Sequence, residues 1–148
     1  MEIIKVIETH ERIMVDTAPI IYHIEEKGIL GKVSEEIFKL IRDRSKHFVF
    51  SSVITFSEVL VHPLRASRKD LVNKYRSFFL MSSNFTIYSI DILIAEKAAE
   101  LRANYGLRTP DALQIAIAIE NNGTLFITND KGLEKIKEVE VLVLGDYF

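Results

Sequence analysis

The sequence predicts an α/β fold in which a mostly parallel five-stranded sheet lies between two layers of helices, a three-layer α/β/α sandwich. Short β-prone runs alternate along the chain with longer segments of helical periodicity. A nearly all-apolar helix at residues 112–119 leads directly into a further β-prone run, as expected of buried elements in such a sheet. The chain has 148 residues and is 48% hydrophobic, so we expect residues 1–148 to form a single domain with a substantial core.

The strands are predicted from runs rich in Val, Ile, Phe and Thr. At the N-terminus, residues 3–7 are expected to form a short edge strand or an arm, so residues 1–11 are treated as an N-terminal extension of the domain. The five core strands are expected at residues 13–15, 47–52, 85–88, 124–128 and 141–144.

The helices are predicted from apolar spacing and from capping residues. Gly28 and Gly31 are expected to bracket a break, and the helix after the second strand is expected to stop before Pro63. Thr109 is predicted to cap a helix with Pro110 at its first position. The other helices are expected after a Thr17 cap, from Ser34 onward, at residues 67–82, and from an Asp91 cap to Gly106.

Composition excludes several classes of protein. The net charge of −2 gives no overall basic field, so any nucleic-acid binding must depend on a local patch. The absence of cysteine excludes disulfides and thiolate metal sites, and it suits a cytoplasmic protein. No run approaches the roughly 18 apolar residues of a membrane span, and the N-terminus lacks the apolar core of a signal peptide, so we expect no membrane partner.

The segment from Arg108 to Gly132 brings two acids together. About ten helical residues cover roughly 15 Å, and about five strand residues cover the same distance in the opposite direction. Asp111 at the start of the helix and Asp130 after the strand should therefore return to the same edge of the sheet. This edge, at the carboxyl ends of the strands, is where open α/β sheets place their functional sites.

Two further acids follow predicted strands, Asp16 after the first and Glu58 after the second. Each of the four has an ordinary structural explanation. Asp16 precedes a helix, Glu58 has capping-box spacing from Thr55, Asp111 suits a first helical turn, and Asp130 suits a turn.

The convergence of four carboxylates on one edge favours a site for a hard cation. Carboxylate oxygens without nearby His or Cys ligands suit Mg²⁺ or Mn²⁺ rather than zinc. Such a cation can clamp phosphate oxygens and activate water, so the arrangement points to metal-assisted hydrolysis of phosphodiester bonds.

Four runs, taken together and in order, resemble the PIN-domain family, and most closely the VapC-type toxin ribonucleases of toxin–antitoxin pairs. They are VDTAPIIY, TFSEVLVHPLR, RTPDALQIAIAI and LFITNDKGL. The resemblance extends from about Ile13 to the C-terminus and implies a PIN-like fold. One departure is Ala18, where many members carry Asn or Ser.

The resemblance also implies an activity and partners. It implies an endoribonuclease that depends on Mg²⁺ or Mn²⁺, forms a homodimer, and is held inactive by a cognate antitoxin protein. The family's catalytic and metal-binding acids correspond to Asp16, Glu58, Asp111 and Asp130, and its hydroxyl residue before the last acid corresponds to Thr128.

An RNA substrate requires basic residues that contact phosphate. Arg108 and Lys131 flank the proposed site, and Arg65, Arg68 and Lys69 lie in a basic stretch whose simplest explanation is a solvated helix face. The apolar positions of the 67–82 helix offer a face on which a second copy could pack.

Two other functions are compatible with a doubly wound fold that carries clustered acids. A receiver-like phosphoacceptor domain needs an acidic pair after the first strand and an Asp after the third, but Asp16 lies between Val15 and Thr17, and the third strand ends at Ser89-Ile90. A PIN-like RNA- or protein-binding module without catalytic activity remains the alternative.

Overall fold

The computed structural model describes residues 2–43 and 46–147 and contains the predicted five-stranded sheet. The strands lie in the order β3-β2-β1-β4-β5, and every neighbouring pair is parallel. The three-layer α/β/α prediction is confirmed, with each strand within two residues of its expected bounds. The strands are β1 (Arg12–Val15), β2 (Phe48–Ser52), β3 (Phe85–Tyr88), β4 (Leu125–Thr128) and β5 (Glu140–Val143).

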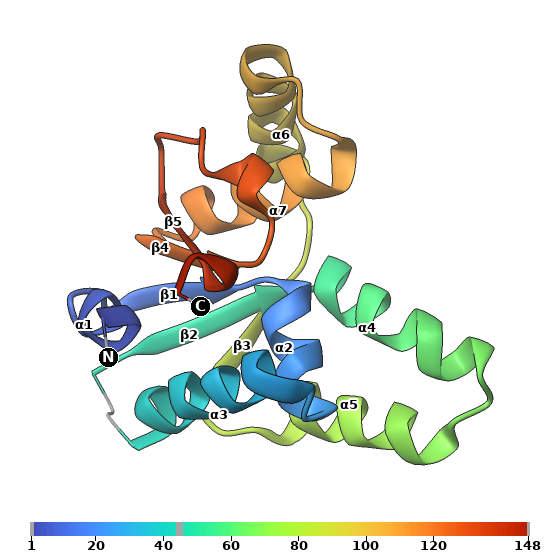
Figure 1. Ribbon diagram of the computed structural model, residues 1–148. Coiled ribbons are helices and arrows are strands. Elements are labelled where there is room, and N and C mark those ends of the chain that lie inside the picture. The colour runs from blue at the N-terminus through green and yellow to red at the C-terminus, as the bar shows by residue number, and fades with distance from the viewer. Residues whose placement is uncertain (1, 44–45, 148) are drawn as a thin grey trace.

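Helices cover both faces of the sheet (Figure 1). On one face α1 (Glu2–Glu8), α2 (Thr17–Ile24), α3 (Gly28–Asp43) and α5 (Lys69–Met81) enclose one apolar core. On the other, α6 (Ile92–Tyr105) and α7 (Thr109–Glu120) enclose a second core against β1, β2 and β4. The remaining helix, α4 (Val53–Arg65), packs beside α5 and projects with it beyond the sheet. Two short 3-10 helices, Lys131–Leu133 and Leu144–Tyr147, follow β4 and β5.

Strand β1 lies at the centre of the sheet. Its Met14 is in register with Phe50 of β2 and with Phe126 of β4. All three side chains are fully buried and belong to the core beneath α6 and α7. This parallel register brings the ends of β1, β2 and β4 to one edge, as the sequence predicts.

The prediction of an edge strand or arm at residues 3–7 is wrong, because this segment is helix α1. Ile3 and Ile7 are spaced four residues apart, so they share one helical face, and both are completely buried in the core shared with α3 and β5. The sequence Ile-Ile-Lys-Val-Ile fits a half-buried strand equally well, so the periodicity of so short a run does not distinguish the two structures.

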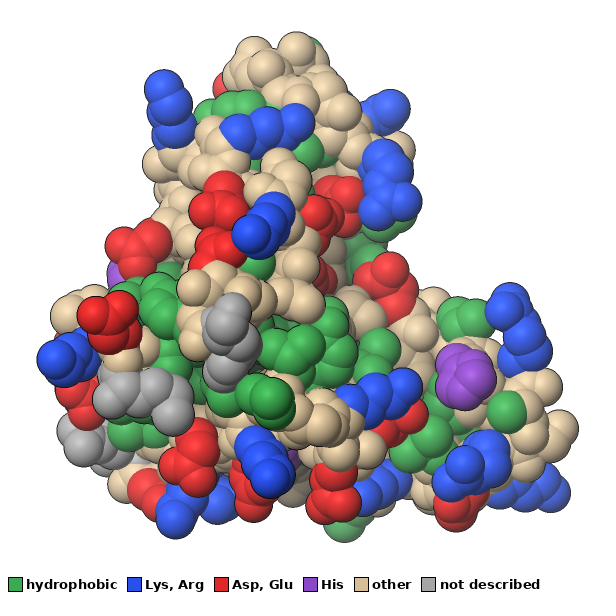
Figure 2. All heavy atoms as spheres, viewed as in Figure 1, with side chains coloured by type: hydrophobic (Ala, Val, Ile, Leu, Met, Phe, Trp, Pro, Cys, Tyr) green, Lys and Arg blue, Asp and Glu red, His purple; other side chains and the backbone are tan. Residues whose placement is uncertain are grey.

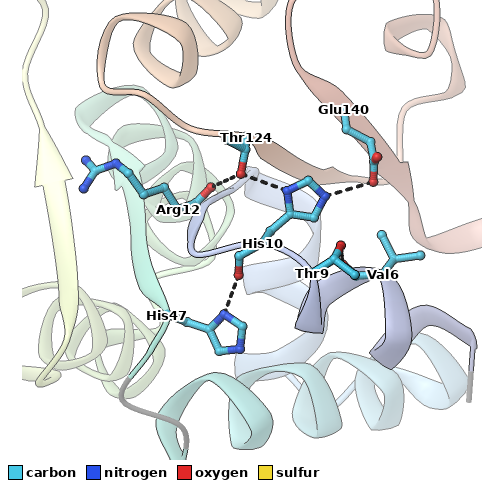
Figure 3. A network of polar contacts seen from close by, with 7 residues as sticks. All are labelled: Val6, Thr9, His10, Arg12, His47, Thr124 and Glu140. Atoms are coloured by element: carbon cyan, nitrogen blue, oxygen red, sulfur yellow. Dashed lines mark hydrogen bonds and ion pairs between the residues drawn. The ribbon is translucent and has the colours of Figure 1, made fainter.

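A network of polar contacts fastens the segment after α1 to the amino-terminal edge of the sheet (Figure 3). The His10 ring lies between Thr124, with Nδ1 2.8 Å from Oγ1, and Glu140, with Nε2 3.1 Å from Oε2. The backbone carbonyl of His10 accepts a hydrogen bond of 2.7 Å from Nδ1 of His47. Residues at the start of β5 and just before β2 and β4 therefore hold one short segment in place.

Two helix boundaries also differ from the sequence prediction. Helix α3 begins at Gly28 and runs without a break through Gly31. A Cβ atom at Gly31 would lie 2.8 Å from the carbonyl carbon of Glu26 and 2.9 Å from the backbone oxygen of Tyr22, so Gly31 permits close packing of α3 on the end of α2. Helix α4 continues through Pro63 to Arg65; this proline lies in the last turn and its ring is buried, so its missing N–H affects only the helix end.

Two capping predictions are wrong and a third is confirmed. The cap of α2 is Asp16, whose carboxylate accepts from the Thr17 N–H, and the cap of α7 is Arg108, without a side-chain hydrogen bond. Asp91 caps α6 as predicted, and Gly106 ends this helix at a φ of 68°. No helix within the described residues is long and apolar enough to cross a membrane.

Candidate functional site

An open cleft of about 270 Å³ lies at the carboxyl edge of the sheet, beside the ends of β1 and β4. In Figure 2, acidic side chains border a hollow between the part of the molecule built by α6 and α7 and the part built by α4 and α5. The cleft is lined by Asp16, Thr17, Ala18, Ile21, Tyr22, Glu58, Pro110, Asp111, Gln114, Thr128, Asn129 and Asp130.

The structure brings all four acids singled out in the sequence to this cleft. Asp16 directly follows β1 and Asp130 closely follows β4. Glu58 comes from the second turn of α4, and Asp111 from the first turn of α7. Helix α7 packs in the core on one face of the sheet, and α4 contributes Val59 to the core on the other face, so the carboxylates approach the cleft from both sides as well as from the sheet edge.

Three donors hold the Asp16 carboxylate. Its Oδ1 accepts from the Thr17 N–H at 2.8 Å and from Nε2 of Gln114 at 3.1 Å. Its Oδ2 accepts from the Thr128 hydroxyl at 2.7 Å. Both oxygens are therefore fixed in direction, which gives Asp16 the best-defined orientation of the four acids.

Burial raises the pKa of Asp16 above its ordinary value. The hydrogen bonds from Thr128, Thr17 and Gln114 oppose this shift, and the nearby charge of Glu58 adds to it. The surroundings thus disfavour the charged carboxylate despite its donors, and a positive charge in the cleft would relieve this cost.

Glu58 is not the capping partner that its spacing from Thr55 suggests. The cap of α4 is Ser52, whose hydroxyl accepts from the Thr55 N–H at 3.2 Å. Glu58 instead accepts a hydrogen bond of 2.8 Å from the hydroxyl of Thr17. This contact crosses from α2 to α4 and places the Glu58 carboxylate beside the cap of α2.

The other two acids have local partners. Asp111 lies 3.2 Å from Nε of Arg108 across one helical turn, and its side chain is 24% exposed. Asp130 caps the 3-10 helix after β4 by accepting from the Gly132 N–H at 2.9 Å. The structural explanations offered by the sequence thus hold for Asp16, Asp111 and Asp130, and all three residues nevertheless line the cleft.

The charge in the cleft is strongly unbalanced. Among the described residues that line it there are four carboxylates and no Lys, Arg or His. In the described part of the chain, no group of three Asp, Glu or His side chains is arranged to hold a metal ion as it stands. The four acids are therefore spread around the walls of the cleft rather than gathered at one point. A cation here would draw its direct ligands from few of the acids and would keep water molecules, as Mg²⁺ commonly does.

Several residues of the cleft were not singled out from the sequence. Gln114 is the one polar residue in an otherwise apolar helical stretch, and this pattern was the available signal. Tyr22 also lines the cleft, and its hydroxyl accepts from Nδ2 of Asn129 at 3.0 Å. Nothing in the sequence marks Asn129, since its importance depends on β4 ending beside α2.

None of the five basic residues proposed to contact phosphate lines the cleft. Arg108 pairs with Asp111 of the lining, and Lys131, which follows Asp130, lies 3.0 Å from Asp146. The other three, Arg65, Arg68 and Lys69, lie at the exposed junction of α4 and α5, and Arg68 pairs with Asp70 at 2.9 Å. Figure 2 shows several basic side chains over this part of the molecule.

The apolar face expected to offer a dimer contact on the 67–82 helix is used largely inside the chain. Leu71, Tyr75 and Phe79 of α5 are buried in the core beneath the sheet. The exposed apolar side chains of this helix are instead Leu80 and Met81 at its end, which are 64% and 79% exposed.

Solved structures with this fold include several proteins of toxin–antitoxin systems. The structure is similar to VapBC2 of Rickettsia felis bound to a promoter DNA fragment (TM-score 0.72, 18% identity, covering 89% of this chain and 98% of that one). It is similar to a toxin–antitoxin complex of Klebsiella pneumoniae (TM-score 0.66, 24% identity, covering 88% of this chain and 96% of that one). It also resembles VapC20 of Mycobacterium tuberculosis, a toxin that cleaves the sarcin–ricin loop (TM-score 0.67, 15% identity, covering 86% of this chain and 98% of that one).

The family assignment comes from the sequence itself. No curated protein sequence matches this chain. The model of the PIN domain matches residues 13–139, which include most of β1, all of β2, β3 and β4, and all four acids of the cleft, whereas β5 follows the matched range. The unmatched N-terminal residues contain α1 and the segment that carries His10. Because the match covers most of the chain, this protein belongs to the PIN domain family.

Proposed function

We propose that this chain is a divalent-metal-dependent endoribonuclease and the toxin of a toxin–antitoxin pair. The observation that carries the proposal is the convergence of Asp16, Glu58, Asp111 and Asp130 on a cleft whose described lining has no basic side chain. Membership of the PIN domain family and the toxin–antitoxin proteins among structures of the same fold support the same reading.

The donor set fits Mg²⁺ or Mn²⁺. Oxygen ligands predominate in the cleft, and its described lining has neither His nor Cys. Asp16, with both oxygens oriented and its charge disfavoured by burial, is the principal ligand in this proposal, and Asp111 lines the same cleft from α7. Glu58 and Asp130 complete the site directly or through water.

The proposed reaction is hydrolysis of a phosphodiester bond. Water adds its oxygen to phosphorus, one phosphorus–oxygen ester bond breaks, and the departing oxygen takes up a proton. A divalent cation bound in the cleft would offset phosphate charge and activate water for this attack. The residues of the chain orient the carboxylates, and Glu58 and Asp130 are the candidates for accepting the proton released by water.

Basic residues outside the cleft are proposed to hold the RNA backbone. The side chain of Arg108 is 80% exposed, so it can exchange Asp111 for phosphate at little cost, and Lys131, 72% exposed, can likewise leave Asp146. Arg65, Arg68 and Lys69 would extend this contact along the α4–α5 junction. Such contacts predict RNA affinity that falls as salt rises.

The test is metal binding and RNA cleavage by the wild type and by Asp111→Asn. Calorimetry should show saturable Mn²⁺ binding by the wild type, and the substitution should weaken it strongly. Cleavage of end-labelled RNA should require the metal, stop in EDTA, and fall at least about 100-fold in the variant, since metal-site electrostatics supply several kcal/mol to such reactions.

Glu120→Gln is the matched control, because Glu120 is an exposed acid at the other end of the same helix, α7. This variant should bind Mn²⁺ and cleave RNA like the wild type. Absence of Mn²⁺ binding at millimolar concentration, or full activity of Asp111→Asn, would rule out the proposed enzyme.

The alternative function is a PIN-like module that binds RNA or protein without cleaving it. It is favoured by the spread of the acids around the cleft, where no three of the described Asp, Glu or His side chains form a preformed metal site. It predicts that the wild type binds RNA with the salt dependence above but leaves the RNA intact at every Mn²⁺ concentration.

We also propose that an antitoxin protein inhibits the chain. A second hollow, of about 180 Å³, lies between α2, α3, α5 and β3, and its lining includes Phe38, Phe78 and Phe85. It is apolar and lies on a different part of the fold from the acids, so it suits an apolar side chain of a protein partner.

Ser83→Trp at the rim of this hollow should abolish inhibition by the cognate antitoxin while RNA cleavage continues. Ser77→Trp, on an exposed position of α5, should be inhibited like the wild type. Unchanged inhibition of Ser83→Trp would place the antitoxin elsewhere.

A homodimer is the remaining part of the proposal. The exposed apolar side chains that a second copy could cover include Leu80 and Met81 on α5, and Ile92 and Leu93 at the start of α6. Sedimentation equilibrium should give twice the monomer mass, and Met81→Glu should shift the equilibrium toward the monomer. A wild type that remains monomeric at millimolar concentration would contradict it.

A further inference from the structure

Gln114 is a buried polar residue in an apolar setting. It lies in the middle of α7 and is only 3% exposed, and its helical neighbours from Ile115 to Ala118 are buried and apolar. Burial of a primary amide in such surroundings is costly unless its donors and acceptor find partners. The partners of Gln114 all lie at the carboxyl edge of the sheet, on elements other than its own helix.

The hydrogen bonds of Gln114 fix the orientation of its amide. The atom that faces the Asp16 carboxylate must be the nitrogen, because an ionised carboxylate only accepts hydrogen bonds. This nitrogen donates to Oδ1 of Asp16 at 3.1 Å and to Oγ1 of Thr55 at 2.6 Å. The amide oxygen accepts a short hydrogen bond from the hydroxyl of Ser52. Both amide hydrogens and the oxygen are therefore used.

The network continues from Gln114 to a second acid. The hydroxyl oxygens of Thr55 and Thr17 lie 3.3 Å apart, and the Thr17 hydroxyl donates to Oε1 of Glu58 at 2.8 Å. Gln114 therefore lies at the centre of a set of side chains that reaches from Asp16, after β1, to Glu58, in α4. It connects the helical layer of α7 with that of α2 and α4 across the edge of the sheet.

We propose that Gln114 is a positioning residue that sets the orientation of Asp16 and its position relative to Glu58. The inference rests on the proposed metal-dependent function, since that function is what requires the two carboxylates to be held in place. Gln114 lines the inner wall of the cleft but presents its amide to protein groups, so it acts through Asp16 and not on the substrate.

The proposal follows from the freedom that Asp16 would otherwise have. Thr17 N–H and Thr128 each direct one oxygen, but Gln114 is the donor that joins Oδ1 to the α4 side of the cleft. Without the amide, Asp16 loses one of its three donors. Thr55 also loses the hydrogen bond from Gln114, so the chain of contacts through Thr55 and Thr17 to Glu58 is no longer connected to Asp16. Outer partners that orient a ligand commonly change metal affinity 10- to 100-fold.

The experiment compares Mn²⁺ affinity, measured by calorimetry, in the wild type, Gln114→Met and Gln114→Asn. Met has nearly the shape of Gln but neither donates nor accepts in the same way, and Asn keeps the amide but draws it back by one methylene. Both variants should bind Mn²⁺ about 10- to 100-fold more weakly. In RNA cleavage, kcat should fall at saturating RNA while KM changes little, because the RNA-contacting surface is intact.

Ile117→Val is the control for loss of packing alone, since Ile117 is a fully buried residue of the same helix that belongs to the core and is absent from the cleft lining. It should retain the wild-type Mn²⁺ affinity. Gln114→Asn keeps the test valid should Gln114→Met fail to fold.

The outcomes separate the two claims. Wild-type Mn²⁺ affinity and kcat in a folded Gln114 variant would overturn the positioning role and leave the proposed function intact. If the wild type itself neither binds Mn²⁺ nor cleaves RNA, the function fails, and the positioning role falls with it. Equal losses in Gln114→Met and Ile117→Val would overturn the positioning role by assigning the effect to packing.

Discussion

The hydroxyl of Thr128 lies 2.7 Å from Oδ2 of Asp16 and donates to it, although the two residues are 112 positions apart in the sequence. Thr128 ends β4 and Asp16 follows β1, so the contact depends on these two strands being neighbours in the sheet. The same hydroxyl oxygen accepts from the backbone N–H of Asp130 at 3.1 Å. One buried hydroxyl thus joins two of the four acids.

Thr128→Val should therefore weaken Mn²⁺ binding about 10-fold or more, since Val preserves the shape but loses the hydroxyl. It should also lower the free energy of unfolding by about 1–3 kcal/mol, because the Asp130 N–H loses its acceptor. Thr128→Ser, which keeps the hydroxyl, should remain close to the wild type in metal affinity. Calorimetry and urea denaturation measure the two quantities, and equal Mn²⁺ affinity of the Val and Ser variants would contradict the role of the hydroxyl.

Asp16→Asn should stabilise the metal-free protein at neutral pH while abolishing Mn²⁺ binding. Because burial raises the folded-state pKa of Asp16, protonation favours the folded state. This favourable contribution is fully present below the ordinary pKa of 3.8 and is lost as pH rises through the folded-state pKa, so the charge opposes folding at pH 7.

Thermal unfolding in EDTA should thus give a higher Tm for Asp16→Asn than for the wild type. Glu120→Gln, an exposed acid on α7, should leave Tm nearly unchanged. A lower Tm for Asp16→Asn would show that its hydrogen bonds outweigh the cost of its burial.

The free energy of unfolding should decrease as the pH is lowered, because of His23. Burial lowers the pKa of His23 below 6.5; Arg42 and Lys74 add to this shift, while Glu35 and Glu26 oppose it. As the pH falls below about 6.5, His23 binds a proton in the unfolded chain but not in the folded chain. The contribution of the neutral ring to the free energy of unfolding is therefore present above this pH and is lost as the pH falls through the folded-state pKa.

His23→Phe removes the titration and keeps a ring against Phe38, whose centroid lies 4.6 Å from that of His23. The free energy of unfolding of this variant, measured in urea, should increase relative to that of the wild type as the pH is lowered from 7 to 5. A constant difference across this range would exclude His23 as the cause, and His62→Phe on the exposed surface of α4 should show no such gain.

His10→Ala should loosen helix α1. The substitution removes the ring contacts with Thr124 and Glu140, and we expect it to cost about 1–3 kcal/mol in the free energy of unfolding. Hydrogen exchange should accelerate in α1 more than in β1, because α1 depends on this segment for its docking. His62→Ala is the control, and equal acceleration in both elements would indicate global destabilisation instead.

The sequence predicts the sheet and the meeting of the acids well, and both successes have the same physical basis. The alternation of strands and helices implies parallel strands, and parallel strands bring their carboxyl ends to one edge. Asp16 and Asp130 could therefore be placed together without knowledge of any contact. Asp111 followed from the matching lengths of α7 and β4.

What the sequence does not show depends on contacts between distant elements. The polarity of Gln114 is visible, but its partners Asp16, Ser52 and Thr55 lie 98, 62 and 59 positions away. Helix α1 is too short for its periodicity to be decisive, and its burial depends on α3 and β5. Pro63 ended the predicted helix by a local rule, whereas the buried ring and terminal position allow α4 to continue.

The central place of β1 has a consequence for biosynthesis. This strand ends at Val15, yet one of its two neighbours in the sheet, β4, begins only at Leu125. Until β4 is available, Asp16 lacks the Thr128 hydroxyl and the cleft lacks Asp130. Pairing across so long an interval is slow compared with local helix formation. A nascent chain is therefore expected to remain without a complete cleft until β4 and Asp130 have been synthesised and have joined the sheet.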